Sequence, residues 1–239
     1  MSSSARGRLG KPLLSSPDDA GTVSGSASVS GLLLACGVIG APVNIAVFTV
    51  EGALRPGYSP IRDYTSFLSL GSDGWINVAN FIVFGVLMAA FAAGVTTVIR
   101  TGPAAPAGPI LLGVSGIGMM AAGLFVADAA SSAATTHGSL HIAASVLFLA
   151  AMTAACFVFA GHYQLVPNRA RFATYCRVTG VAFAVLFGAT PVLDGAGVAG
   201  LLQRIGILVL STWIVLLAVR LIQEGATARQ TPAMRADET

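Results

Sequence analysis

The chain has 239 residues, of which 55% are hydrophobic and only 10% are charged. Soluble domains carry about 25% charged residues, so this composition excludes an ordinary water-soluble domain. The mean hydropathy is +0.80, and repeated apolar runs of bilayer-spanning length predict an integral membrane protein. The net charge of +3 comes from basic residues in loops and tails. We expect these residues to report membrane topology, and we expect no nucleic-acid partner.

Two polar tails flank the apolar part of the sequence. Residues 1–30 are rich in Ser and Gly and low in hydrophobicity, which predicts a disordered cytoplasmic tail. A signal peptide is not expected, because the first apolar run begins near Gly31 and is long enough to span a membrane. Residues 223–239 form the second predicted cytoplasmic tail. The region between them, 31–222, is the predicted membrane domain.

The membrane domain divides into six apolar segments, each near the ~20 residues that a spanning helix needs. All six are predicted to be helical, because unpaired backbone groups are too costly in lipid. Small residues such as Gly113, Gly116 and Gly118 favour close helix packing. The sequence thus predicts an all-α integral membrane protein with a six-transmembrane-helix bundle. The predicted spans are 31–50, 75–99, 110–127, 139–161, 172–192 and 199–222.

The distribution of arginine predicts the orientation. Basic residues occur in the N-terminal tail, in the second and fourth connections and at the C-terminal end. The third and fifth connections, 128–138 and 193–198, carry none. The first connection, 51–74, has Arg55 and Arg62 but also three carboxylates. By the positive-inside rule, both termini are expected in the cytoplasm and the three odd-numbered connections outside.

This topology gathers most polar side chains at the outer end of the bundle, where we therefore expect a functional site. The other end holds ordinary interfacial anchors, and all three cysteines map to that half, so no extracellular disulfide framework is expected. The outer set comprises Glu51, Arg55, Asp63, Asp73, Asn77, Asn80, Asp128, His137, His141, Asp194, Gln203 and Arg204.

His137 and His141 are four residues apart, which places both imidazoles on one face of a helix. The metalloprotease motif with the same spacing needs a glutamate after the first histidine, and here Gly138 stands in that position. A divalent metal bound by the two histidines and Asp128 is one option. Metal-free acid/base chemistry or ligand contact is a second, and hydrogen-bonded packing is a third.

Two charged residues, Asp128 and Arg204, have more than one interpretation each. Asp128 is either an acid/base group near the hydrocarbon or a cap for a helix in the loop. Arg204 either extends to the interface, pairs with a carboxylate such as Asp194 or Glu51, or binds an anionic head group. The catalytic candidates are Asp128, His137, His141, Asp194 and Glu51. The candidate substrate-binding residues are Arg204, Arg55, Asp63, Tyr64, Trp75 and Asn80.

The first outer connection, 51–74, is long enough to be a functional loop. Its second half mixes charged, aromatic and apolar residues, which favours a short helix at the membrane interface. Tyr64 and Trp75 are natural interface anchors. A lid that covers the outer end of the bundle is therefore expected here, and Ser66 lacks the local sequence of a nucleophile elbow.

Two motif regions resemble one family. They are the stretch from Arg55 to Gly71 with the following Gly74-Trp75, and the stretch from Gly123 to Asp128 with Thr136-His137-Gly138-Ser139-Leu140-His141. Both resemble the prokaryotic six-helix membrane family catalogued as domain of unknown function 998, over about residues 31–222. The resemblance implies a six-helix fold in a prokaryotic plasma membrane, as a multi-pass protein, and no particular activity.

A weaker likeness is to membrane hydrolases of the alkaline ceramidase and adiponectin receptor type. These use an Asp, a Ser and three His around zinc. The likeness implies that Asp128, His137 and His141 are the counterparts of three of these residues. A third histidine is missing, because His162 is predicted at the opposite membrane face.

The sequence leaves two function classes open. The first is an intramembrane enzyme that acts on a lipid-like or isoprenoid substrate by acid/base or metal-assisted chemistry. Its reaction would be hydrolysis or proton-initiated isomerisation or cyclisation. The alternative is a non-enzymatic lipid-binding, transport or accessory protein. In both, the expected partners are membrane lipids or a hydrophobic small molecule.

Overall fold

The structure is a computed structural model that describes residues 17–130 and 132–237. Within these ranges the chain is helical, with two short 3₁₀ helices in the connections, η1 (Thr65–Ser69) and η2 (Asp194–Ala196). The long helices are α1 (Pro17–Leu54), α2 (Gly74–Val98), α3 (Ala104–Leu124), α4 (Thr136–Leu165), α5 (Ala170–Gly188) and α6 (Ala199–Asp237).

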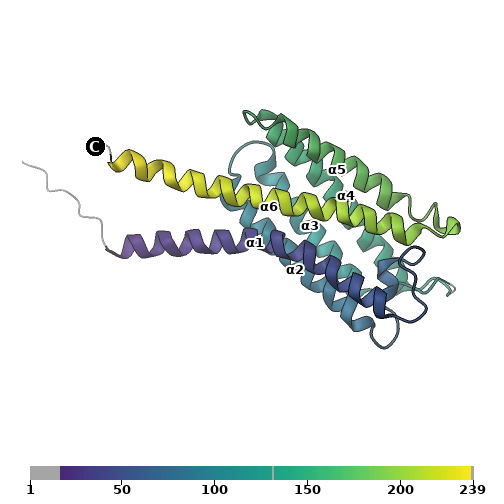
Figure 1. The fold of residues 1–239 in the computed structure, drawn as a ribbon. Coiled ribbons are helices and arrows are strands. Elements are labelled where there is room, and N and C mark those ends of the chain that lie inside the picture. Colours follow the sequence, from purple (N-terminus) through teal and green to yellow (C-terminus); the bar gives the residue numbers. More distant parts are fainter. Residues whose placement is uncertain (1–16, 131, 238–239) are drawn as a thin grey trace, which may run out of the picture.

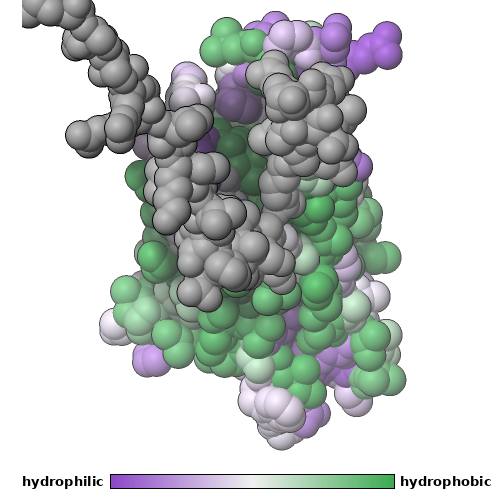
Figure 2. Space-filling model, turned by 90° about the vertical axis from the view of Figure 1, so that its left-hand side faces the viewer, coloured by the Kyte–Doolittle hydropathy of each residue, from purple (hydrophilic) through white to green (hydrophobic). Residues whose placement is uncertain are grey.

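Each of the long helices contains a stretch of 19 to 30 residues that is long and apolar enough to cross a membrane. At about 1.5 Å per residue, even the shortest of these covers most of the hydrocarbon layer. The predicted all-α, six-helix membrane fold is therefore confirmed. Hydrophobic residues also cover most of the flanks seen from the end where the termini lie (Figure 2).

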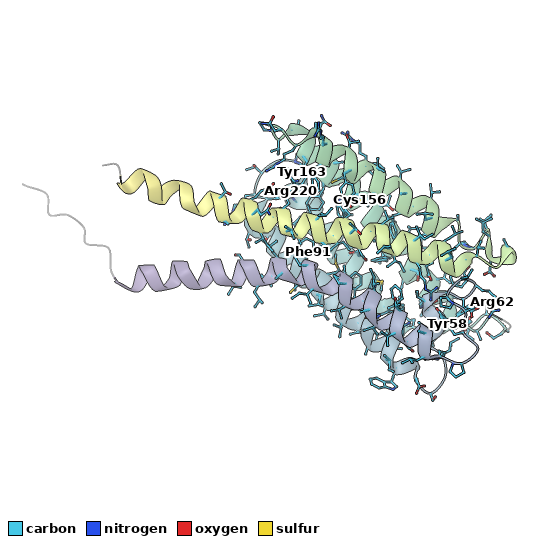
Figure 3. All side chains as sticks on the ribbon, viewed as in Figure 1. Tyr58, Arg62, Phe91, Cys156, Tyr163 and Arg220 are labelled. Atoms are coloured by element: carbon cyan, nitrogen blue, oxygen red, sulfur yellow. The ribbon has the colours of Figure 1, made fainter. Side chains whose placement is uncertain are left out.

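Both described ends of the chain lie at the same end of the bundle, where α1 and α6 extend beyond the other helices (Figure 1). The connections 55–73, 125–135 and 189–198 lie at the opposite end, which we call the distal end. Tyr58 and Arg62 mark the distal end, and Tyr163 and Arg220 mark the other (Figure 3). That the distal end faces outward remains a prediction.

Several helix boundaries differ from the predicted ones, and three of these differences bear on the tails and on the candidate site. Helix α1 begins at Pro17, inside the predicted N-terminal tail, of which residues 1–16 lie outside the described residues. Helix α6 continues to Asp237, through most of the predicted C-terminal tail. Helix α3 ends at Leu124, three residues early, because Phe125 adopts extended backbone angles (φ −98°, ψ 98°).

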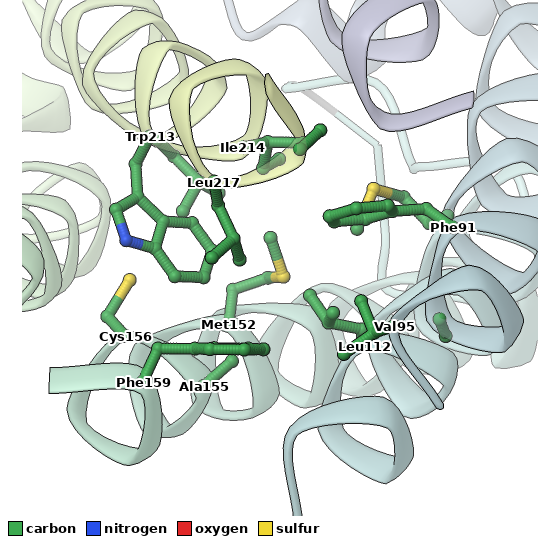
Figure 4. Packing of buried hydrophobic residues seen from close by; sticks show 14 of the residues in the cluster. Phe91, Val95, Leu112, Met152, Ala155, Cys156, Phe159, Trp213, Ile214 and Leu217 are labelled. Carbon is green, nitrogen blue, oxygen red and sulfur yellow. The ribbon is translucent and has the colours of Figure 1, made fainter. Parts of the chain in front are cut away.

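The helices form a closed ring around one apolar core. Each helix packs on the next in the chain, and α6 returns to pack on α1. In the core, Met152 and Phe159 of α4 meet Trp213 and Leu217 of α6, and Phe91 approaches from α2 (Figure 4). This ring places the distal ends of α1, α2, α4, α5 and α6 around a common centre.

Two glycines set the distance between α2 and α3. A Cβ atom built on Gly85 would lie 2.5 Å from the carbonyl oxygen of Gly116, and one on Gly116 would lie 2.6 Å from that of Gly85. Gly118 similarly approaches the carbonyl oxygen of Ala144 in α4, at 3.1 Å from its hypothetical Cβ. The predicted close packing holds at Gly116 and Gly118, whereas Gly113 has nothing within 4 Å.

Candidate functional site

The connection 55–73 folds across the distal end and is held to α6 by Arg204. The Arg204 guanidinium donates to the carbonyl oxygens of Pro60 (2.6 Å), Asp63 (3.0 Å) and Gly200 (3.0 Å), and it contacts the Tyr58 hydroxyl. The predicted pairing of Arg204 with a carboxylate is therefore not found. Its Nη1 and Nη2 hold a loop, and the binding of an anionic head group by Arg204 stays a prediction.

Arg55 holds the same connection to α1. Its Nη2 pairs with Glu51 Oε1 at 2.5 Å, and its guanidinium donates to the carbonyl oxygens of Leu70 (2.5 Å) and Leu68 (2.9 Å). Arg55 was predicted as a binding residue and Glu51 as a catalytic one. In the structure they form an ion pair, and Arg55 holds the connection 55–73 to α1. Asp63 also serves the loop: its carboxylate accepts from the Ser59 N–H (2.7 Å) and from Arg62 Nε (2.8 Å).

Helix η1 is buried in the distal end of the bundle, whereas the sequence predicted a short helix lying at the membrane interface. Leu68 is fully buried, and Thr65 is 3% exposed. The Thr65 N–H donates to Gln203 Oε1 at 2.8 Å, and Asn77 Nδ2 donates to the Thr65 carbonyl oxygen at 2.9 Å. The contacts of η1 are with α1, α2 and α6. The connection 55–73, which contains η1, is therefore the lid of the distal end. It packs on α1, α2 and α6, on one side of the ring.

Asp128 organises the start of α4. Its Oδ2 accepts from the Thr135 N–H (2.8 Å) and its Oδ1 from the Thr135 hydroxyl (2.6 Å). The Thr135 Oγ1 in turn accepts from the Gly138 N–H at 3.0 Å, which is an N-cap hydrogen bond. A Cβ on Gly138 would collide with the Asp128 carboxylate. Of the two interpretations for Asp128, the geometry corresponds to capping.

This cap makes stability depend on pH in a definite direction. The hydrogen bonds from Thr135 hold the pKa of Asp128 below its ordinary value. A carboxylate with a lowered folded-state pKa stabilises the fold above its unfolded-state pKa, near 3.9, and that contribution is lost as pH falls through the folded-state pKa. We expect the thermal midpoint in detergent to fall between pH 5 and pH 3 less in Asp128→Asn than in the unmodified chain.

Asp73→Asn is the matched control for this pH dependence. Asp73 precedes α2 as a cap residue but makes no side-chain cap hydrogen bond. The control should follow the unmodified chain over the acid range. An Asp128→Asn profile that coincides with the unmodified profile at every pH would contradict the cap assignment.

His141 is buried, with 6% of its surface exposed. Its Nδ1 lies 2.9 Å from the carbonyl oxygens of both Ala122 and Phe125. Because carbonyl oxygens only accept hydrogen bonds, Nδ1 carries the proton and donates to the free carbonyls at the end of α3. In an uncharged ring of this tautomer Nε2 is an acceptor, and within the described ranges no hydrogen bond joins Nε2 to another residue.

His137 does not join His141 in a common site. It is exposed and stacks edge-on against Phe125, with ring centroids 5.7 Å apart. In the part of the chain that the structure describes, no group of three or more His, Cys, Asp or Glu side chains could hold a metal ion. Asp128, His137 and His141 therefore do not provide the geometry of the metal option.

A cavity of about 420 Å³ lies at the distal end, between the lid and the facing sides of α4 and α5. Its apolar wall includes Ile142, Val146 and Leu149 of α4, Phe187 of α5, and Pro191 of the following connection. Its polar lining consists of Tyr64, Ser66, Asp128, His141, Ser145, Thr190 and Gln203.

A smaller recess of about 50 Å³ lies beside this cavity, towards the centre of the ring. The two spaces share Ser66, His141, Ser145, Phe187 and Gln203 in their walls. The recess has room for a few water molecules or one small polar group. Its remaining wall is mostly aromatic and aliphatic, and it includes Phe81, Phe84, Phe148 and the amide of Asn44.

The structure thus brings three predicted site residues to the cavity wall: Asp128, His141 and Tyr64. Burial raises the pKa of the Tyr64 hydroxyl, and the nearby charge of Asp194 acts in the same direction, so Tyr64 remains a hydrogen-bond donor. Asp194 itself is exposed in η2. The others lie elsewhere: Trp75 is 69% exposed, and buried Asn80 donates to the Asn44 carbonyl oxygen at 3.3 Å.

Two wall residues were not singled out from the sequence: Asn44, which lines the recess, and Ser145, which lines both spaces. Gln203 was placed in the polar outer set without a role. Asn44 is 5% exposed, and its Oδ1 is sealed from solvent without a hydrogen-bond partner. A polar amide in the middle of an apolar span was the available signal, since such residues usually face the bundle interior. Ser145 carries no such signal, because serine also occurs in ordinary helix contacts in lipid.

Comparison with known proteins gives a family and no activity. Residues 38–220 match the family described as "Protein of unknown function (DUF998)". No curated protein and no solved structure matches the chain significantly.

Proposed function

The chain belongs to the DUF998 family, and we propose that it is a lipid-binding membrane protein that takes a lipid-like molecule into its distal cavity. The observation that carries the proposal is one space with an apolar wall on α4 and α5 and a polar wall around His141. Its volume of about 420 Å³ falls within the range of small-molecule sites, about 300–1,000 Å³.

The position of the lid favours entry from the lipid side. Helix η1 packs on α1, α2 and α6, and its contacts close the distal end there. The cavity lies on the other side of the lid, where exposed Ile142 and Val146 line its wall. An apolar chain could rest between α4 and α5 while its polar end reaches His141 under the lid.

A second candidate, an acid/base hydrolase, is favoured by the fixed ring of His141. In nucleophilic catalysis a third group orients the base, and here two carbonyl oxygens orient Nδ1 and leave Nε2 for a proton. The hydroxyls of Ser66 and Ser145 line the same cavity. The proton-initiated reaction has less support, because Thr135 holds Asp128 in its charged form.

One probe tests both candidates. We expect monooleoylglycerol to bind the full chain in detergent micelles, and we expect Ser145→Phe to reduce binding by tenfold or more, because Ser145 lines both the cavity and the recess and the new ring would fill part of that space. Native mass spectrometry measures the bound probe, and chromatography of the mixture measures any released oleate. Release of oleate that disappears in His141→Gln would select the hydrolase.

Ala143→Phe is the matched control for the blocking variant. Ala143 is exposed on the same helix and does not line the cavity. It should bind the probe as the unmodified chain does. Equal binding by Ser145→Phe and the unmodified chain, with both variants folded, would refute the proposed cavity site.

A further inference from the structure

Neither the cavity nor the recess offers a cation to an anionic head group. Among the residues that line them there is no Lys or Arg. Arg204 and Arg55 lie at the same distal end, but both donate to backbone carbonyl oxygens of the connection 55–73. Arg55 donates to those of Leu70 and Leu68. Arg204 donates to those of Pro60 and Asp63. Binding of phosphate in proteins relies on such cationic donors.

The arrangement of carboxylates disfavours a charged head group of either sign. Asp128 is the one carboxylate in the lining of the cavity, and no carboxylate lines the recess. Both oxygens of Asp128 already accept from Thr135. A cationic head group in the recess would therefore be buried without a counter-charge, which is costly.

The walls present both hydrogen-bond acceptors and hydrogen-bond donors. Asn44 lines the recess, and its Oδ1 has no hydrogen-bond partner. In the uncharged ring of His141, whose Nδ1 donates to α3, Nε2 is a second acceptor. The hydroxyls of Ser66 and Ser145 line both spaces and can donate. Because a hydroxyl group both donates and accepts, it can satisfy both kinds of wall atom, whereas an ammonium group can only donate.

We infer that the cavity selects lipids whose polar end is an uncharged hydroxyl group, which enters the recess and donates to His141 or Asn44. This inference rests on the proposed lipid-binding function and adds the chemical class of the head group. It excludes phospholipids and fatty acids as the preferred ligands, although both are common amphiphiles with apolar chains of the same kind.

The test compares three probes that share one chain: oleyl alcohol, oleyl phosphate and oleylamine. We expect the full chain in detergent micelles to bind the alcohol at least tenfold more tightly than either charged probe by native mass spectrometry. We expect Asn44→Leu to weaken the binding of oleyl alcohol about fivefold, the scale of one hydrogen bond. Its backbone carbonyl, which accepts from Asn80, is kept in this variant.

The outcomes separate the inference from the function on which it rests. If oleyl phosphate or oleylamine binds as tightly as the alcohol and Ser145→Phe blocks both, the cavity binds lipids but the inference is wrong. If Ser145→Phe leaves the binding of all three probes unchanged, the proposed function itself fails. Alcohol binding that is unaffected in both Asn44→Leu and His141→Phe would also overturn the inference.

Discussion

Replacement of Gly116 by leucine is expected to lower the free energy of unfolding by about 3 kcal/mol or more, which is at the upper end for overpacking in a core. Gly116 and Gly85 face each other across α2 and α3, and a Cβ on either would lie 2.5–2.6 Å from the carbonyl oxygen of the other. The obstacle is backbone and not a flexible side chain, so the two helices must separate. The midpoint of unfolding by SDS titration in mixed micelles measures the effect.

Gly113→Leu is the control that separates a steric effect from a loss of glycine. Gly113 lies in the same helix, three residues earlier, with nothing within 4 Å of its hypothetical Cβ. The same substitution there should change stability by less than about 0.5 kcal/mol. If Gly116→Leu and Gly113→Leu behaved alike, the close approach of α2 and α3 would not be a determinant of stability.

The fold was predictable because the bilayer leaves few options for the backbone. Apolar length alone located the spans of α2 and α4 to within about four residues at either end. The end of α3 was missed, because it depends on a tertiary contact: His141 takes the carbonyl oxygens of Ala122 and Phe125, which lie 19 and 16 residues away.

The location of the candidate site was easier to predict than the roles of its residues. Alternating spans bring Tyr64, Asp128 and His141 to one end from three connections or helix ends, and the cavity lies among them. The role of a charged residue depends on its partner, and the sequence does not show which partner it meets. The sequence allows both a catalytic role and a capping role for Asp128, and its contacts with Thr135 correspond to capping.

Arg204 shows the same limit most clearly, because its hydrogen-bond partners lie up to 146 residues away in the chain. Sequence reasoning offered it a carboxylate or a phosphate, the usual partners of a guanidinium. In the structure it meets backbone carbonyls of a loop and the faces of two rings, with its Cζ 5.4 Å from the centroid of Tyr58 and 5.9 Å from that of Phe48. No local pattern encodes such a contact.

Arg204→Ala is accordingly expected to destabilise the chain by about 3 kcal/mol, because it leaves the carbonyl oxygen of Pro60 without its donor. It also removes the shorter of the two hydrogen bonds to the Asp63 carbonyl oxygen, which keeps only the one from the Tyr58 hydroxyl at 3.3 Å. The lid connection should detach at temperatures where the helix bundle is still folded, because this residue holds the connection to α6. Chymotrypsin cleavage after Tyr64 should therefore become faster at temperatures where the bundle is still folded. Mass spectrometry of the fragments over time measures the rate.

Arg62→Ala is the control, because it removes a guanidinium from the same connection without touching α6. Arg62 is exposed, and its side chain contacts only the neighbouring Asp63 among the described residues. Exposed ion pairs of this kind add little to stability, so cleavage and unfolding should stay near those of the unmodified chain. Arg204→Lys should recover only part of the loss, since one ammonium cannot reproduce the planar fork that spans the loop and the Tyr58 hydroxyl. Equal cleavage rates in Arg204→Ala and Arg62→Ala would show that the lid is held by Gln203, Asn77 and Arg55 without Arg204.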